Sequence, residues 1–160
     1  MVGKGWSGRF VPLIAPGFSA DEDVIQAVGE PMLGVLNTAH WTHDLQVPAN
    51  VEFVAAFRQK YDGRYPSVYA AMAYDTLMAM DAAVRDAGGK VEDREAVLKA
   101  LKNPSFKSVR GEFKYGANNF PVQNYYLREV GKDAAGRITN KLVGTTLEQH
   151  QDAYVGACKM

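Results

Sequence analysis

The residues from Val68 to Ala87 limit what this 160-residue chain can fold into more than any other stretch. They follow Pro66-Ser67, precede Gly88-Gly89, and are mostly Ala, Met, Tyr and Leu, which predicts a helix that is apolar almost all round. Asp81 and Arg85 are spaced to form an ion pair across one turn of this helix. A helix with so few polar side chains is predicted to be buried on most sides, as when it packs against a sheet.

The sequence predicts too few strands before the helices for a complete parallel sheet. A parallel sheet needs one strand for each crossover helix, and the strands that precede the helices are too few for that. We therefore expect an α/β chain that is part of something larger. In order, the patterns predict a buried strand at Arg9–Pro16, a helix capped by Ser19 and begun by Asp21–Asp23, and a second buried strand at Met32–Leu36. They then predict helices from Pro48, at Val68–Ala87 and at Glu92–Lys102, and strands at Phe106–Tyr115, Gln123–Val130 and Arg137–Val143.

The charge and hydropathy of the chain exclude several classes of protein. Eighteen acidic residues balance eighteen basic ones, which removes the electrostatic case for binding nucleic acid or an anionic membrane. The most apolar run, Val68–Met80, is interrupted by Asp75 and is too short to span a bilayer. No apolar segment follows Lys4, as it would in a secretory signal. The acidic runs Asp21–Asp23 and Glu92–Glu95 are expected to be solvated helix starts.

The segment from Asn37 to Leu45, NTAHWTHDL, holds two of the chain's three histidines. His40 and His43 would ligate zinc if a third ligand such as Asp44 joined them, and a small zinc-dependent enzyme is one hypothesis. The segment follows a predicted strand and precedes Pro48, so a loop is favoured over the helical turn that such a pair needs. The alternative is a polar and aromatic loop at the carboxyl edge of a sheet, where ligands bind in open α/β folds.

Three further sequence features support weaker conclusions about function. Gly3–Gly8 matches G-x-G-x-x-G, but no strand leads into it and no helix follows, so a flexible glycine-rich segment is the better interpretation. Cys158 is the only cysteine, so it has no partner in this sequence, and its place near the end is a poor one for a nucleophile. Tyr69, near the start of the long helix, is either a core aromatic or part of a ligand-binding surface.

Four segments, taken in order, carry a resemblance to a known family. The first two are PGFSADEDVIQAVGEPMLGVLNTAHW and PANVEFVAAFRQKYDGRYPSVYAAMAYDTLMAMDAAVRDAG. The others are VRGEFKYGANNFPVQNYYLREV and a closing ACKM. The series resembles the substrate-binding proteins of ABC importers for branched-chain amino acids and related compounds, which are type I periplasmic binding proteins.

The resemblance implies an α/β fold that is a portion of a two-lobed, Venus-flytrap structure. Residues 1–42 would belong to the second lobe, residues 43–119 to the first lobe, and residues 120–160 would return to the second. Half of such a structure exposes sheet edges and apolar helix faces. We therefore expect a chain of this extent to be poorly stable or to self-associate.

The resemblance also implies a function without catalysis, metal or cofactor. The chain would be part of a periplasmic solute-binding protein that holds an amino acid or a related aliphatic or aromatic carboxylate and delivers it to the membrane permease of an ABC importer. A ligand-sensing domain of a receptor or regulator on the same fold is the alternative. Cys158 would pair with a cysteine outside this sequence. The ligand-binding residues implied are Gly17, Phe18, His40, Trp41 and Tyr69, with packing in the hinge as the other role for His40 and Trp41.

Overall fold

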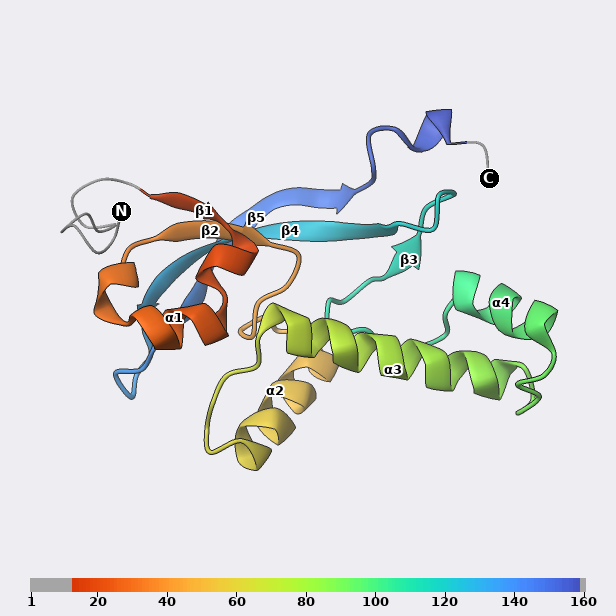
Figure 1. Cartoon of the computed structure of the whole chain (residues 1–160), viewed down its shortest axis with the longest axis horizontal. Coiled ribbons are helices and arrows are strands. Elements are labelled where there is room, and N and C mark those ends of the chain that lie inside the picture. Colours follow the sequence, from red (N-terminus) through yellow and green to blue (C-terminus); the bar gives the residue numbers. More distant parts are fainter. Residues whose placement is uncertain (1–12, 159–160) are drawn as a thin grey trace.

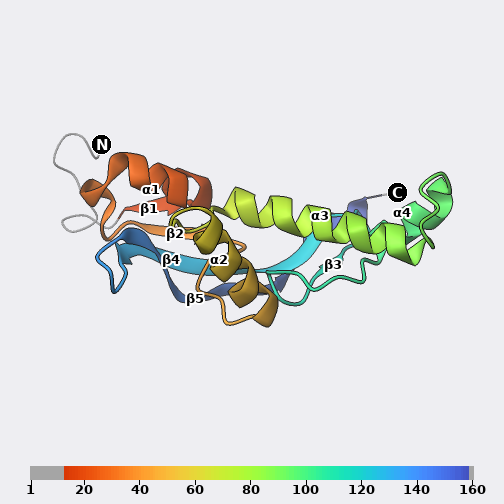
Figure 2. The same cartoon turned by 90° about the horizontal axis from the view of Figure 1, so that it is seen from below.

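The computed structural model describes residues 13–158, which form one sheet with the main helices on one side of it. Figure 1 shows the strands in an upper layer with α1, α2 and α3 below them, and Figure 2 shows α3 running lengthwise along the molecule. The strands are β1 (Ile14–Pro16), β2 (Leu36–Ala39), β3 (Lys114–Tyr115), β4 (Pro121–Lys132) and β5 (Ile138–His150). β1 and β2 are parallel, and β4 runs antiparallel to β2, β3 and β5.

The described strands correct three predictions. β1 was expected to be buried, but Ile14 is 72% exposed because β1 is an edge strand with β2 on one side. The strand expected at Met32–Leu36 begins only at Leu36, since Gly34 has a φ of 83° that interrupts extended backbone. Of the strand expected at Phe106–Tyr115, only Lys114–Tyr115 is formed. The glycine motif Gly3–Gly8 lies outside the described residues.

The two longest helices begin and end close to where the sequence predicts. α2 (Pro48–Lys60) has proline in its first turn, and α3 (Val68–Asp86) is preceded by Ser67, whose hydroxyl accepts a hydrogen bond from the Ala70 N–H at 3.2 Å. α4 spans Arg94–Lys102. The expected ion pair between Asp81 and Arg85 is present on the surface of α3.

The start of α1 (Glu22–Val28) differs from the prediction. Ser19 is not its cap, because the chain forms a short 3-10 helix, η2 (Gly17–Ala20), and Asp21 occupies the capping position. The Asp21 carboxylate accepts the Val68 N–H, 3.1 Å from each oxygen, and so caps α3 instead of its own helix. Asp21 and Glu22 are 2% and 3% exposed. The expectation that this acidic run is solvated is therefore wrong for both residues.

Two apolar clusters hold the helices against the sheet. One lies between α2, α3 and the sheet and contains Trp41, Phe53 and Tyr126. The other lies between α1 and the sheet and contains Ile25, Val35 and Val130. No helix among residues 13–158 is both long enough and apolar enough to cross a membrane.

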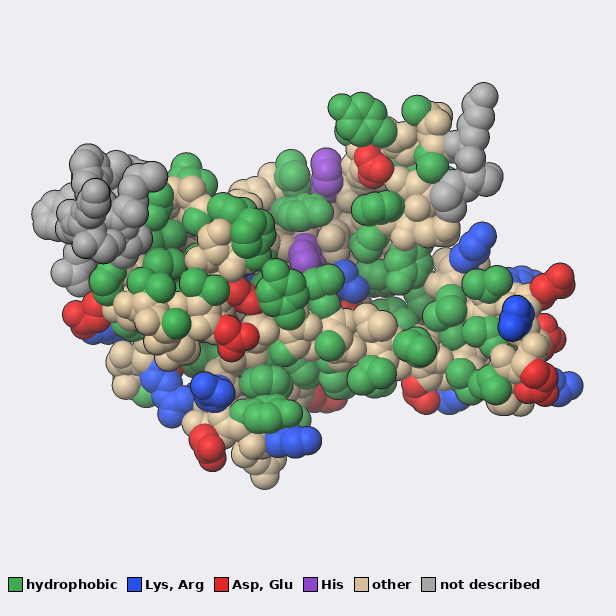
Figure 3. Space-filling model, viewed as in Figure 1, with side chains coloured by type: hydrophobic (Ala, Val, Ile, Leu, Met, Phe, Trp, Pro, Cys, Tyr) green, Lys and Arg blue, Asp and Glu red, His purple; other side chains and the backbone are tan. Residues whose placement is uncertain are grey.

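The prediction that α3 is buried on most sides is wrong. Its buried residues, among them Ala71, Asp75 and Ala79, lie on one face. On the opposite face Tyr69, Leu77 and Met80 are 61%, 66% and 54% exposed, and Figure 3 shows hydrophobic side chains along this helix. Part of the apolar surface of α3 therefore remains uncovered in this chain.

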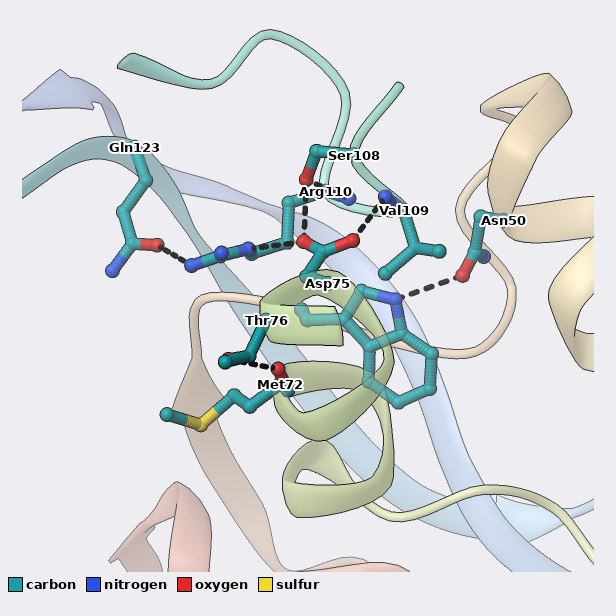
Figure 4. A network of polar contacts seen from close by, with 9 residues as sticks. Asn50, Met72, Asp75, Thr76, Ser108, Val109, Arg110 and Gln123 are labelled. Atoms are coloured by element: carbon teal, nitrogen blue, oxygen red, sulfur yellow. Dashed lines mark hydrogen bonds and ion pairs between the residues drawn. The ribbon is translucent and has the colours of Figure 1, made fainter. Parts of the chain in front are cut away.

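A buried carboxylate fixes α3 to the loop before β3. Asp75 is 1% exposed and accepts hydrogen bonds from Ser108 Oγ at 2.6 Å, Val109 N at 3.0 Å and Arg110 Nε at 2.9 Å (Figure 4). Arg110 also donates to Gln123 Oε1 of β4 at 2.9 Å. The Val109 N–H thus bonds to Asp75 and the Arg110 N–H to Ser108 Oγ at 3.0 Å, so both donate to side chains and not to a neighbouring strand.

We predict that Asp75→Ala will lower the free energy of unfolding by about 3 kcal/mol, because the buried donors of Ser108 and Val109 and the half-buried Arg110 lose their acceptor. Urea denaturation followed by circular dichroism measures the change. Asp81→Ala on the same helix is the matched control, since its surface ion pair with Arg85 contributes little. Equal effects of the two substitutions would contradict a structural role for the buried carboxylate.

Candidate functional site

A buried arginine joins the sheet to the segments that surround the candidate site. Arg128 of β4 is 1% exposed. It donates to Asn37 Oδ1 of β2 at 2.8 Å, to the Gly17 carbonyl of η2 at 3.2 Å and to the Trp41 carbonyl at 3.4 Å. Burial lowers the pKa of Arg128, and the nearby carboxylates, Asp21 first among them, oppose this. The ends of β1 and β2 are thus held at fixed positions beside β4.

A second set of buried bonds joins α1 and β2 to β5. Glu22 accepts from the Asn140 N–H and side-chain amide, both at 3.0 Å, and from Thr139 Oγ1 at 2.9 Å. The amide of Asn140 also donates to the Ala20 carbonyl at 2.8 Å and accepts from Asn37 Nδ2 at 2.7 Å. Because each group here has a partner, this network stabilises a single arrangement of the sheet.

His43 belongs to this structural network. Its Nε2 lies 2.8 Å from the Asn140 carbonyl and 2.9 Å from Thr139 Oγ1, and its ring stacks on Tyr65 at 4.1 Å. Since a carbonyl can only accept, we assign the ring proton to Nε2. Among residues 13–158 no group of three or more His, Cys, Asp or Glu side chains is arranged to hold a metal ion. The hydrogen bonds of His43 therefore account for this histidine without zinc.

A cavity of about 200 Å³ lies between η2, the end of β2, the start of α3 and β4. It brings together four residues that the sequence nominated, Gly17, Phe18, His40 and Tyr69. The sequence reasoning missed the other lining residues. Met72 follows Tyr69 by one helical turn, so helix periodicity points to it. No comparable signal marks the rest, which are Thr38, Ala39, Val68 and Tyr125.

Trp41, the fifth nominated residue, does not line this cavity. It is 1% exposed, and its indole Nε1 donates to Asn50 Oδ1 at 2.8 Å. Its ring meets the edge of Phe53, with the ring centroids 6.3 Å apart. Trp41 packs in the core between the loop after β2 and α2, and its packing in a hinge stays a prediction.

Two cavity residues have environments that limit what can replace them. A Cβ on Gly17 would come within 2.4 Å of the Thr38 carbonyl oxygen and 2.9 Å of the Ala39 Cβ, so η2 approaches β2 as closely as only glycine permits. Burial lowers the pKa of His40 to about 4, and the positive charges of Arg110 and Arg128 act in the same direction. His40 Nε2 is buried and has no hydrogen-bond partner. The cavity therefore has a neutral imidazole in its wall at neutral pH.

Comparison with known proteins identifies the family. The model of the periplasmic binding protein family matches residues 4–136. The Leu/Ile/Val-binding protein homolog 6 of Brucella abortus is 33% identical over 153 residues, a match that covers 92% of this chain and 38% of the relative. The chain thus spans well under half the length of this curated relative.

Solved structures agree with this assignment. A solute-binding protein of an ABC transporter from R. palustris, in complex with benzoate, is 35% identical with a TM-score of 0.81, over 94% of this chain and 39% of that one. Another, from Rhodopseudomonas palustris HaA2 in complex with p-hydroxybenzoic acid, is 25% identical with a TM-score of 0.82, over 98% and 42%. The chain belongs to the periplasmic binding protein family, and its fold is a mixed α/β domain that matches part of the type I structures.

We predict that Gly17→Ala will lower the free energy of unfolding by about 2 kcal/mol, because η2 must move away from β2 to admit the methyl group. Gly144→Ala in β5 is the control, since no atom lies within 4 Å of the Cβ it would add. Urea denaturation of both variants gives the comparison. A loss for Gly17→Ala no larger than that for Gly144→Ala would show that the close approach is not required.

We predict that His40 stays neutral from pH 8 down to about pH 5.5, which its ring signals in an NMR titration would report. Its pKa in the folded chain, about 4, lies below the ordinary histidine value of 6.5. The unfolded chain therefore takes up this proton first, and the contribution to stability is lost as the pH falls from about 6.5 toward 4. His40→Gln should remove that part of the pH dependence. Titration of His40 near pH 6.5 would contradict the prediction.

Proposed function

We propose that this chain is part of a periplasmic solute-binding protein that captures a small carboxylate and delivers it to the permease of an ABC importer. Such a protein binds and releases its ligand without catalysing a reaction. The observation that carries the proposal is the cavity formed by Gly17, Phe18, His40 and Tyr69, at the carboxyl ends of two parallel strands. Open α/β sheets bind ligands at that edge.

The chemistry of the cavity favours the apolar part of such a ligand. Phe18, Tyr69, Met72 and Tyr125 supply aromatic and thioether surface, and the lining includes no Lys or Arg. A benzene ring fits this wall, whereas a carboxylate finds no cation in it. Two similar proteins are described with benzoate and p-hydroxybenzoic acid, which agrees with an aromatic carboxylate as the ligand.

The proposal includes a two-lobed arrangement in which the cavity lies between lobes. Residues 1–42 and 120–160 would belong to one lobe and residues 43–119 to the other. In support, β1, β2, β4 and β5 share one sheet, while α2, α3 and α4 all come from the middle segment. Gly17 and Tyr125 of the cavity come from the lobe of residues 1–42 and 120–160, and Tyr69 comes from the lobe of residues 43–119. Closure of the lobes on a ligand is then a hinge motion.

The test is a thermal-shift and calorimetric titration of the chain with benzoate, 4-hydroxybenzoate, L-leucine and zinc. A ligand that binds the native state raises the unfolding midpoint, and we expect the benzoates to do so more than L-leucine. Tyr69→Ala should weaken benzoate binding about tenfold, because the ring loses its aromatic contact.

Tyr154→Ala is the matched control, since Tyr154 is also exposed and does not line the cavity. It should leave the affinity unchanged. Equal affinities of the two tyrosine variants would exclude the cavity as the binding site. A midpoint that rises with zinc alone would favour the metal-site hypothesis instead.

A further inference from the structure

A second cavity lies on the other side of the first turn of α3. Its volume is about 490 Å³, within the range of small-molecule sites, and it shares no lining residue with the first cavity. Its walls come from α1, the end of α2, the connection from α2 to α3 and the start of β5. Ser67 and Ala70 line this cavity, whereas Val68 and Tyr69 line the first.

One wall of the second cavity is aromatic. Phe57 and Tyr61 follow each other by one turn at the end of α2, with ring centroids 4.4 Å apart. Phe57 is half-buried and Tyr61 is 44% exposed. These adjacent rings form an apolar surface that an aliphatic or aromatic group can cover.

The second cavity has a basic side. Arg64 and Arg137 line it, and Figure 3 shows basic side chains gathered between α1 and the connection from α2 to α3. The Arg137 guanidinium donates to the Gly63 carbonyl, which restrains this side chain beside the cavity. Among residues 13–158, no side chain forms a hydrogen bond or ion pair with the Arg64 guanidinium. Arg64 is thus available to a carboxylate.

Another part of the lining is acidic. Glu22 and Asp23 line it from the first turn of α1. Glu22 already accepts bonds from Thr139 and Asn140, so its oxygens are committed. Asp23 is exposed, and in the described part of the chain its carboxylate has no hydrogen-bond or ion-pair partner. The Ser67 hydroxyl, which accepts from Ala70, keeps its own proton free to donate.

We propose that this cavity is a second small-molecule site, for a zwitterion with an apolar side chain. Its two cations and two carboxylates balance, but the opposite charges come from different elements, so an ion of one sign would be repelled by one side. A carboxylate at Arg64, an ammonium at Asp23 and an apolar group over Phe57 and Tyr61 satisfy all three surfaces. An amino acid or a dipeptide has this chemistry.

The test uses L-phenylalanine as the probe, with 3-phenylpropanoate and 2-phenylethylamine as analogues that each lack one charge. Amide shifts of the isotope-labelled chain locate the binding. We expect L-phenylalanine to perturb Asp23, Gln26 and Gly63, whereas occupancy of the first cavity would perturb Thr38 and Ala39. The two analogues should bind at the second cavity about tenfold more weakly, because each leaves one charge unpaired.

Two variants decide the assignment. Arg64→Ala should weaken the binding of L-phenylalanine about tenfold but leave that of 2-phenylethylamine unchanged. Asp23→Asn should also weaken the binding of L-phenylalanine about tenfold but leave that of 3-phenylpropanoate unchanged. Arg94→Ala, an exposed arginine of α4, is the control. Unaltered L-phenylalanine binding in both variants, or shifts confined to Thr38 and Ala39, would overturn the proposal. The cavity of the proposed function is tested separately by Tyr69→Ala.

Discussion

The buried hydrogen bonds of Arg128 and Asn140 are the constraint on which the rest of the structure depends. Each side chain contacts two or more elements that are distant in sequence, so together they fix η2, α1, β2, β4 and β5 relative to one another. A buried guanidinium is costly unless its donors are satisfied, and here Asn37, Gly17 and Trp41 supply the acceptors. These bonds set the position of η2, and with it one wall of the first cavity.

Buried carboxylates position the opposite wall. Asp21 caps α3 through the Val68 N–H and so places Tyr69 across the first cavity from Gly17. Burial raises the pKa of Asp21, while the Val68 N–H opposes that rise by stabilising the charged form. The helix terminus gains an acceptor for an otherwise unpaired N–H group, which compensates for placing the charge inside. Asp75 fixes the middle of the same helix to the loop before β3.

The two cavities are related through this helix. Val68 and Tyr69 line one, Ser67 and Ala70 line the other, and both cavities combine residues from the sheet segments with residues from α3. The remaining apolar face of α3, with Leu77 and Met80, is uncovered in a chain that spans 38% of the length of its Brucella relative. Uncovered apolar surface of this kind favours association, and poor stability or self-association of this chain stays a prediction.

The sequence by itself determined the helices and the nominated cavity residues. Local signals such as Pro48, Ser67 and the glycines after α3 mark helix ends, and the resemblance nominated Gly17, Phe18, His40 and Tyr69. Only the tertiary structure decided that Trp41 packs in the core, that Asp21 caps a helix 47 residues further along the chain, and that Asp75 binds Ser108 and Val109. The outcomes for Asp21 and Asp75 depend on hydrogen bonds between distant segments, and that for Trp41 depends on packing against α2 and the sheet. Periodicity and capping patterns report only on neighbouring residues, so they carry no information about them.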